Sequence, residues 1–405
     1  MRFGLSSEQE AFRDQLRRLL AARAPLERVR EVASEGSGYD ARLWTGLAEL
    51  GAMGVLVPEQ HGGLGMGAFD AGLVLEELGR HVAPAPYLVS AFVAPLLLAE
   101  CGSDLLATEW LSRIAGGEAR IGLALTEVVS VRADTGIRNE GGRLYGKALA
   151  ALDAGAADAF IVAAGEGLWL VRADASHFVR TPMTSIDRTR SLAELRFDGV
   201  EAEPLGGGMQ LTKRALDLAR VALAADTLGA ADAMVEQATA YSRQRVQFER
   251  VIGSFQGVKH ALADMVAALE PARALVWYAV HSQTAMPGND AHRLACHAKA
   301  HLARLGEWLL AAQQKCMAAW DSPTILACTS GSSALALIVS YWARPNRFGQ
   351  RRRPLWPPDG RTGQAAIFSS VSSKVSALPA SGWLASSVTL SPSMPITVNC
   401  IWPPF

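Results

Sequence analysis

The sequence predicts an α+β protein in which a small β domain lies between two helical regions. Three changes of pattern along the 405 residues support this prediction. Apolar residues recur at helical spacing up to about residue 120, form short alternating groups to about residue 206, and then return to helical spacing. We therefore expect domains at 1–120, 121–206 and 207–315, followed by a tail at 316–405 with a different pattern.

The composition is that of a globular protein and does not indicate a highly charged partner such as nucleic acid. Hydrophobic residues make up 50% of the chain, and 39 Lys and Arg balance 39 Asp and Glu, which predicts neither nucleic-acid nor membrane binding. The five cysteines lack C-x-x-C spacing, which argues against a disulfide framework or a zinc knuckle. The N-terminus becomes polar at once, so we expect no secretory segment and a reducing, cytoplasmic setting.

The N-terminal region carries helix signals. Ser6 or Ser7 can cap a first helix, whose apolar residues are Phe12, Leu16, Leu19 and Leu20. Residues 42–50 and 71–79 repeat this spacing. Between them, residues 56–65 read LVPEQHGGLG, where a proline and three glycines predict a turn without helix.

The middle region predicts a compact β domain. Its short apolar or alternating segments, each bounded by Gly, Asp or Asn, are IGLAL, GRLYG, AFIVAA, LWLVRA and AELRFDGV. Segments of this length and alternation are typical of strands. Gly-Gly-Gly-Met at 206–209 marks the return to helix.

The third region begins with one long helix, because residues 211 to about 241 nearly lack Gly and Pro. Arg220 and Arg245 would fall near one face of a continuous helix, about 37 Å apart. A second helix is expected over about 257–285. Pro-Gly-Asn-Asp then breaks it, and Asp290 can cap a third helix that runs to about residue 315.

Three segments in this order resemble one family. Residues 241–260, YSRQRVQFERVIGSFQGVKH, resemble the flavin-binding signature of the acyl-CoA dehydrogenase family, R-x-[QT]-F-G followed by F-Q. Residues 56–65 resemble its V-P-E-x-x-G-G-x-G loop, and residues 187–200 resemble the end of its β-barrel. The resemblance covers residues 1 to about 315. It implies an N-terminal helical domain, a central β-barrel domain, a C-terminal helical bundle, the cofactor FAD and an acyl-CoA substrate.

The resemblance assigns five residues to the cofactor. Arg245 would reach the pyrophosphate of an FAD held mainly by a neighbouring subunit, since its planar cation suits that group. Gln247 would add an amide, and Phe248 an aromatic face for adenine. Gln256 corresponds to the glutamine of the F-Q pair. Thr126 corresponds to the threonine of the family's flavin motif T-E-P-x-x-G-S.

The chain departs from the family pattern at some of these positions. Val128, Val129 and Ser130 follow Thr126-Glu127 without the Gly-Ser of the T-E-P-x-x-G-S motif, and Glu249 stands where the family usually has glycine. We expect the Glu249 carboxylate to point away from a pyrophosphate. The alternatives are that Thr126 is a plain strand residue and that Arg245 lies at an ordinary solvated helix end.

By the same resemblance, Asp217 and Arg220 line the acyl-CoA site. Their i, i+3 spacing puts them on one helix face, and a surface ion pair is the alternative. One branch of the family carries its catalytic base at the position of Arg220, but arginine cannot act as a base at neutral pH. The catalytic base therefore has no assigned residue. Similar sequences occur as one subunit of heteromeric acyl-CoA dehydrogenases, in which the partner supplies missing groups.

Four histidines raise the question of a metal site. His297 and His301 have i, i+4 spacing, but no acidic ligand accompanies them at H-E-x-x-H spacing. We therefore expect no metal site. The four residues are His281, His292, His297 and His301.

The tail from residue 316 is rich in Ser, Pro and Trp. A disordered tail and a membrane helix at 325–342 are two interpretations. The third is a shifted reading frame: synonymous codons from Lys315 onward, read from the last base of the lysine codon, give V-H-G-G-M-G-F-T. That string resembles the family's C-terminal flavin loop, [QV]-x-H-G-G-x-G-F-T. The restored frame would place leucine at the other family position of the base.

The sequence thus predicts an FAD-dependent acyl-CoA dehydrogenase-like subunit that catalyses α,β-dehydrogenation of an acyl-CoA thioester. Its partners would be the acyl-CoA, an electron-transfer acceptor, and like or unlike subunits in an oligomer. A non-catalytic structural partner of a heteromeric dehydrogenase, or an inactive frameshifted product, is the alternative.

Overall fold

A computed structural model describes residues 4–129, 135–286 and 288–318. The interpretations of the tail beyond residue 318, including the membrane helix at 325–342 and the shifted reading frame, lie outside the described residues. Within the described part, none of the helices is both long enough and apolar enough to cross a membrane.

The N-terminal region is helical, as predicted. Ser6 caps the first helix: its hydroxyl accepts from the backbone N–H of Gln9 at 3.2 Å, and the Gln9 side chain accepts from the backbone N–H of Ser6 at 3.0 Å. The helices are α1 (Ser7–Arg23), α2 (Leu26–Glu35), α3 (Ala41–Glu49), α4 (Ala68–Arg80), the π-helix η3 (Leu88–Val93), α5 (Ala94–Glu100) and α6 (Asp104–Ala115).

The turn at residues 56–65 contains one short helix, so the prediction of a turn without helix is wrong there. Glu59–His61 form the 3₁₀ helix η2, shortly after a first one, η1 (Ala52–Gly54). The backbone N–H of Gly65 then donates to the carbonyl of Val57 at 2.9 Å. A Cβ on Gly63 would lie closer than 3.0 Å to the backbone of Val57, so this close return of the chain requires glycine.

The β domain is one mixed sheet with the order β6-β7-β3-β1-β4-β5-β8, and β2 pairs with β3. Only the β1–β4 pair is parallel among the described strands. The strands are β1 (Ile121–Ala124), β2 (Gly136–Glu140), β3 (Arg143–Leu152), β4 (Ala159–Ala164), β5 (Gly167–Arg172), β6 (Phe178–Met183), β7 (Leu192–Glu201) and β8 (Glu203–Pro204).

The predicted central β domain between two helical regions is confirmed, but its sheet is not closed into a barrel, because its two ends, β6 and β8, are not paired with each other in the described structure. The physical reason is the length of β8. It has two residues before the chain enters the next helix, so it cannot supply the ladder of hydrogen bonds that closure requires.

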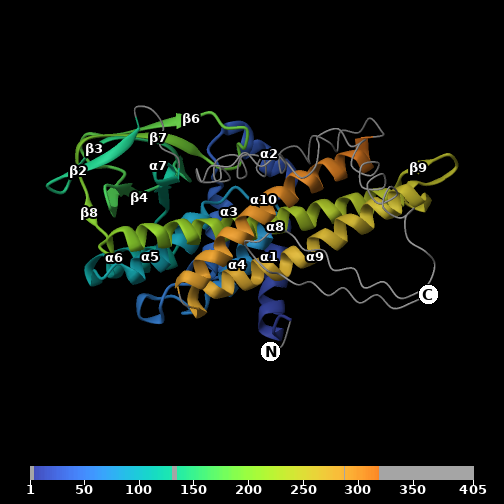
Figure 1. Cartoon of the computed structure of the whole chain (residues 1–405), viewed down its shortest axis with the longest axis horizontal. Helices are drawn as coiled ribbons and strands as arrows, with labels where there is room; N and C mark the ends of the chain where they lie inside the picture. The colour runs from blue at the N-terminus through green and yellow to red at the C-terminus, as the bar shows by residue number, and fades with distance from the viewer. Residues whose placement is uncertain (1–3, 130–134, 287, 319–405) are drawn as a thin grey trace, which may run out of the picture. The chain divides into compact units, whose positions relative to one another are not determined.

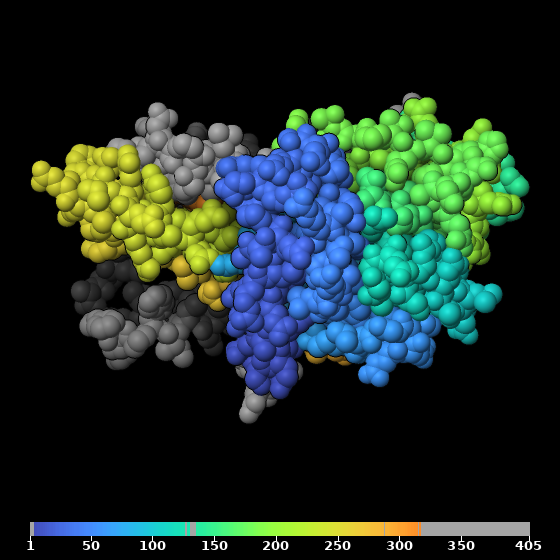
Figure 2. Space-filling model, turned by 180° about the vertical axis from the view of Figure 1, so that it is seen from behind, coloured from blue at the N-terminus to red at the C-terminus, as the bar shows by residue number. Residues whose placement is uncertain are grey.

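Three long helices follow the sheet and lie side by side (Figure 1). They are α8 (Gly208–Gln244), α9 (Gln256–Ala285) and α10 (Gly288–Ala318), and a small hairpin of β9 (Val246–Gln247) and β10 (Arg250–Val251) joins the first two. The predicted long helix is therefore confirmed. Asp290 lies in the first turn of α10 and not at its cap, because α10 begins at Gly288, three residues before the expected start at Ala291. Seen from behind, the N-terminal helices (blue) lie between the sheet and the ends of α8 and α9 that the β9–β10 hairpin joins (Figure 2).

Helices α4 and α8 cross in backbone contact at two glycines. A Cβ built on Gly229 of α8 would lie closer than 3.0 Å to the carbonyl oxygen of Glu76, and one on Gly79 of α4 would meet the carbonyl oxygen of Asp226 in the same way. Only glycine permits this approach of the two main chains. The crossing brings the N-terminal region directly onto the central helix of the molecule.

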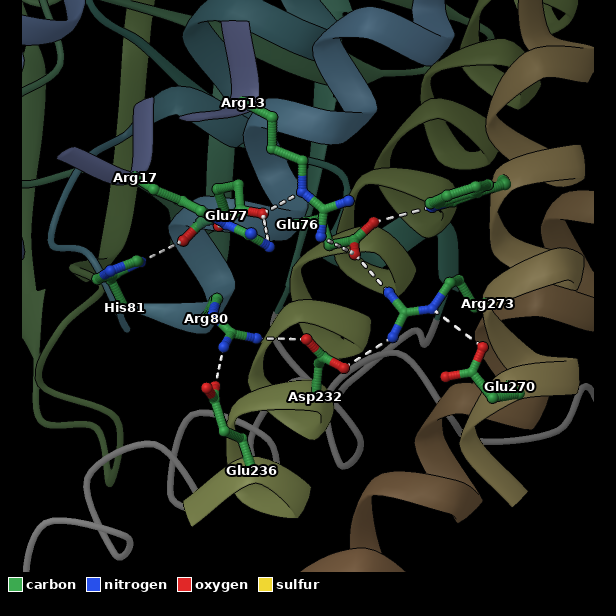
Figure 3. A network of polar contacts seen from close by, with 11 residues as sticks. Arg13, Arg17, Glu76, Glu77, Arg80, His81, Asp232, Glu236, Glu270 and Arg273 are labelled. Atoms are coloured by element: carbon green, nitrogen blue, oxygen red, sulfur yellow. Dashed lines mark hydrogen bonds and ion pairs between the residues drawn. The ribbon is translucent and has the colours of Figure 1, made fainter. Parts of the chain in front are cut away.

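A network of ion pairs surrounds this crossing (Figure 3). Arg273 of α9 donates to Glu76 of α4 at 2.7 Å and to Asp232 of α8 at 2.7 Å, so one guanidinium joins three helices. Trp277 also donates to Glu76, at 2.8 Å. Burial raises the pKa of the Glu76 carboxyl, which these donors oppose. Further pairs of the network involve Arg13, Arg17, Glu77, Arg80 and Glu236.

A second buried charge cluster joins the β domain to α8. Arg190, in the segment before β7, donates to Asp226 of α8 at 2.7 Å and lies 3.9 Å from Asp153. Asp187 accepts from the backbone and hydroxyl of Thr189 at 2.8 and 2.6 Å, which shapes the turn that presents Arg190. The segment Asp187–Arg190, which the sequence marked only as a family motif, is thus a structural anchor.

Asp153 should make the stability of the protein fall as pH rises from about 4 to about 6. Burial raises its pKa to about 6, and Arg190 only partly opposes this. Because that value lies above the ordinary 3.8, the folded protein keeps a proton that the unfolded chain releases in this interval. We expect Asp153→Asn to remove this slope and to raise the free energy of unfolding at pH 7 by about 3 kcal/mol, at about 1.4 kcal/mol per pH unit.

Urea unfolding of both proteins between pH 4 and pH 8 measures this difference. Asp198→Asn, at an exposed position of β7, is the matched control and should leave the slope unchanged. Equal slopes in the wild type and Asp153→Asn would contradict the prediction.

Candidate functional site

A large cavity, of about 1650 Å³, lies between α8 and α10. Val128 and Val129 of the short helix α7 (Thr126–Val129) also reach its wall. Five lining residues are cationic, Lys213, Arg214, Arg220, Lys299 and Arg304, against three carboxylates, Glu100, Asp217 and Glu307. The excess of positive charge suits an anionic ligand.

Asp217 and Arg220 meet at the wall of this cavity. Arg220 donates to the Asp217 carboxylate at 2.9 Å, and Asp217 is only 6% exposed, so the pair is not a surface ion pair. His292 of α10 also lies 2.9 Å from Asp217, through Nδ1. One buried carboxylate therefore orients a cation from its own helix and an imidazole from the next.

Lys299 and Cys296 complete this wall of the cavity. Burial and the neighbouring Arg220 lower the pKa of Lys299 to about 8, so the cavity keeps this charge at neutral pH and loses it in mild alkali. Cys296 lies with its Sγ 3.5 Å from a guanidinium nitrogen of Arg220 and 3.8 Å from Nε2 of His292. Burial raises the pKa of the Cys296 thiol, which Arg220 opposes.

Arg245, Gln247 and Phe248 belong to the hairpin at the other end of α8. Arg245 is the C-terminal cap of that helix, and its carbonyl accepts from Ile252 at 2.8 Å. The hairpin turn places Phe248 and Glu249 at φ values of 51° and 63°, a conformation that favours glycine. This backbone accounts for the family's glycine at the position of Glu249, whose side chain is exposed here.

A second cavity, about 540 Å³, lies beside this hairpin. Gln247, Phe248 and Phe255 line one side, and Trp308 and Cys316 of α10 line the other. The Phe248 ring is 79% exposed and stands edge-on to Phe255 at 6.1 Å between centroids. Gln256 begins α9 directly after Phe255, and no side chain of the described residues caps that helix start.

The structure therefore separates the predicted site residues into two groups. Asp217 and Arg220 face the first cavity, and Thr126 begins α7 beside it, so the alternative that Thr126 is a strand residue is wrong. Arg245, Gln247, Phe248 and Gln256 gather at the far end of α8. Arg220 lies inside that helix and Arg245 caps its end, 25 residues on, so the two groups are roughly 37 Å apart. Within one chain the two groups do not form a single site.

Sequence reasoning missed the group formed by Asp217, His292 and Cys296. Their ligand-type atoms lie within 4.8 Å of one another in the described structure, although we expected no metal donors to meet. The i, i+4 spacing of His292 and Cys296 was available in the sequence. The third member, Asp217, is 75 residues earlier in the chain, and only the packing of α10 on α8 brings it near.

Two family models match the chain. Residues 6–118 match the N-terminal domain of acyl-CoA dehydrogenases, and residues 206–317 match their C-terminal domain.

Known proteins agree with this assignment. The chain is 33% identical over 278 residues to acyl-CoA dehydrogenase IpdE2 of Mycobacterium tuberculosis, which is 68% of this chain and 77% of that protein. It is 28% identical over 299 residues to an acyl-CoA dehydrogenase of Bacillus subtilis, covering 67% and 78% of the two chains.

Among solved structures, the steroid acyl-CoA dehydrogenase Tcur3481-Tcur3483 (G363A variant) is similar with a TM-score of 0.74 and 29% identity, covering 82% of this chain and 93% of that one. The ChsE4-ChsE5 complex of Mycobacterium tuberculosis contains a chain with the same fold, at a TM-score of 0.76 and 21% identity, covering 94% of this chain and 100% of that one. The chain therefore belongs to the acyl-CoA dehydrogenase family of flavoprotein oxidoreductases.

Proposed function

We propose that this chain is a subunit of an FAD-dependent acyl-CoA dehydrogenase that works only in an oligomer. The observation that carries the proposal is the separation of the two predicted groups by the length of α8. A cavity suited to an acyl-CoA lies near one end, and an exposed cofactor-type hairpin lies at the other. Further subunits, one docked at each end of α8, would complete both sites.

The first cavity supports the binding of an acyl-CoA thioester. Its volume of about 1650 Å³ accommodates a large ligand, and its excess of cations suits the phosphates of CoA. Arg220 is held in place by Asp217 and so presents a fixed charge to the ligand. The steroid dehydrogenase with 29% identity motivates a test with steroid side-chain thioesters beside simple fatty acyl thioesters.

The hairpin fits the pyrophosphate and adenine side of FAD. Arg245 offers a planar cation, Gln247 an amide, and the uncapped start of the 30-residue helix α9 offers backbone N–H groups. Phe248 presents an exposed aromatic face next to Phe255. Gln256 is the first residue of that helix, and Thr126 would lie against the flavin ring held by its own chain. Bound FAD would supply the acceptor for the β-hydride, and the electrons would then pass to an external electron-transfer acceptor.

At the position of Arg220, this chain does not supply a catalytic base. A guanidinium stays protonated at neutral pH, so it can bind an anion or stabilise negative charge, but it cannot remove the α-proton. We therefore propose that an acyl-CoA dehydrogenase-like partner subunit contributes a carboxylate. The solved ChsE4-ChsE5 complex is a precedent for a two-component assembly with this fold.

A non-catalytic structural role in such an assembly is the second candidate. It is favoured by one observation: Val128 and Val129, two apolar side chains that follow Thr126 and Glu127, occupy the cavity wall, and the chain has no Gly-Ser after them as the family's flavin motif does. In that case the partner would bind FAD without any contribution from this chain.

Flavin binding tests the proposal. The full chain, alone and co-purified with a candidate partner subunit, is titrated with FAD and followed by visible absorbance and flavin fluorescence. Arg245→Met should weaken FAD binding roughly 10- to 100-fold, because charge-assisted hydrogen bonds contribute about 1.5–3 kcal/mol each.

Arg243→Met is the matched control, since Arg243 is exposed in the last turn of the same helix. It should bind FAD as the wild type does. The absence of flavin bands in every preparation would sink the proposal. Equal affinities of the two variants in the complex would favour the structural role instead.

A further inference from the structure

The cavity between α8 and α10 contains a thiol, an imidazole and a carboxylate in a row. Sγ of Cys296 lies 3.8 Å from Nε2 of His292, and Nδ1 of the same ring lies 2.9 Å from the Asp217 carboxylate. This order, nucleophile to base to orienting acid, is the arrangement that activates a nucleophile for acyl transfer. All three side chains line the cavity that would hold the thioester.

The geometry points to a second activity of this cavity, the transfer of the acyl group of an acyl-CoA thioester to Cys296. It rests on the proposed entry of acyl-CoA thioesters into the same cavity. It does not rest on FAD, on the partner's base or on dehydrogenation.

The step is balanced within the residues present. Sγ of Cys296 attacks the thioester carbonyl carbon while His292 accepts the thiol proton, and the carbonyl electron pair moves to oxygen. The attack gives a tetrahedral intermediate. When its carbonyl re-forms, the bond to the CoA sulfur breaks, and that sulfur takes the proton from His292. One thioester replaces another, free CoA leaves, and neither an oxidant nor a reductant is consumed.

Each neighbour of Cys296 has a part in this step. The Asp217 carboxylate, 6% exposed, orients the His292 ring through Nδ1 and leaves Nε2 facing the sulfur. Burial raises the pKa of the Cys296 thiol, so the thiol stays protonated until a base removes its proton during the attack. Arg220, 3.5 Å from Sγ, places a permanent cation beside the attacking sulfur, where it can stabilise the negative oxygen.

A divalent metal ion is the other ligand that an aspartate, a histidine and a cysteine could share. The position of Arg220 argues against it. Its guanidinium already donates to Asp217 and contacts Cys296, so a fixed positive charge occupies the space between two of the three donors. Repulsion between that cation and a metal ion favours the acyl-transfer interpretation.

Mass spectrometry of the full chain tests the inference. The flavin-free protein is incubated with butyryl-CoA and with octanoyl-CoA, and the intact mass, the modified peptide and the released CoA are measured. We expect one acyl group on Cys296 and at least one equivalent of free CoA. His292→Gln should slow the transfer roughly 100-fold or more, since a positioned base contributes about 10²–10⁴-fold.

Cys316→Ala is the matched control for Cys296→Ala. Cys316 is also half-buried on α10, and burial raises its pKa too, but it lines the other cavity. Cys316→Ala should retain the adduct, and Cys296→Ala should lose it.

Three results overturn the inference: no adduct on Cys296, equal labelling of Cys296 and Cys316, or stoichiometric Zn²⁺ binding that Cys296→Ala abolishes. Calorimetric titration with the same acyl-CoA separates this failure from that of the proposed function. If the acyl-CoA binds without transfer, only the inference falls. If it does not bind, the proposed substrate falls as well.

Discussion

Gly229→Ala should lower the free energy of unfolding by about 3 kcal/mol or more, at or beyond the upper end of the usual cost of overpacking. The new methyl group would meet the carbonyl oxygen of Glu76 closer than 3.0 Å, and that oxygen belongs to the main chain of α4. A flexible side chain could move aside, but here two whole helices must separate.

The separation would also disturb the ion pairs that surround the crossing. Arg273 bonds Glu76 on one helix and Asp232 on the other, so moving α4 from α8 strains or breaks one of these bonds. Glu76 is buried, and a buried carboxylate without its donor is costly. The loss is therefore larger than the clash alone predicts.

Thermal and urea unfolding followed by circular dichroism measure the effect. Gly257→Ala is the matched control, because Gly257 lies in the first turn of α9 and a Cβ there meets no atom within 4 Å. The control should leave stability unchanged or raise it slightly. Equal stability of the two variants would show that α4 and α8 do not cross in backbone contact.

Arg190→Met should lower the free energy of unfolding by about 3–5 kcal/mol, the usual effect of removing one partner from a buried charge group. The substitution keeps a long apolar stem but leaves Asp226, Asp187 and Asp153 without their cation. All three carboxylates are buried, and burial already raises the pKa of each. The variant should therefore be least destabilised in mild acid, where these groups are protonated.

Arg188→Met, two residues earlier on the same turn, is the control, because Arg188 is exposed. It should unfold as the wild type does. A double-mutant cycle with Asp226→Asn isolates the pair: the second substitution should recover part of the loss caused by the first. A loss below about 1 kcal/mol in Arg190→Met, as for an exposed ion pair, would contradict the buried cluster.

The helical parts of the fold could be predicted because their signals are local. The cap of α1 at Ser6 and the continuous α8 follow from neighbouring residues, and the structure confirms both. The strands β2, β6 and β8 were not recognised. β2 and β6 are largely exposed, so their residues show little apolar alternation, and β8 has only two residues.

The resemblance gave the right order of helices, β domain and helices, but neither it nor the chain predicted that the sheet stays open. Closure depends on whether the first and last strands of the order, β6 and β8, can reach each other with matched ladders. Closure therefore depends on strand pairing across about 25 residues of chain and on where α8 begins. Neither can be predicted from a local sequence pattern.

The candidate site divides in the same way. The sequence by itself determined which residues were candidates for binding: Arg245, Gln247 and Phe248 stand in one contiguous motif, and Asp217 and Arg220 share one helix face. Only the tertiary structure decided which of them meet.

The packing of α10 on α8 brought His292 and Cys296 to Asp217, and the length of α8 kept that cluster away from the hairpin. The physical reason is that helix periodicity depends on hydrogen bonds between near neighbours. The juxtaposition of helices depends instead on how side chains far apart in sequence fill shared space.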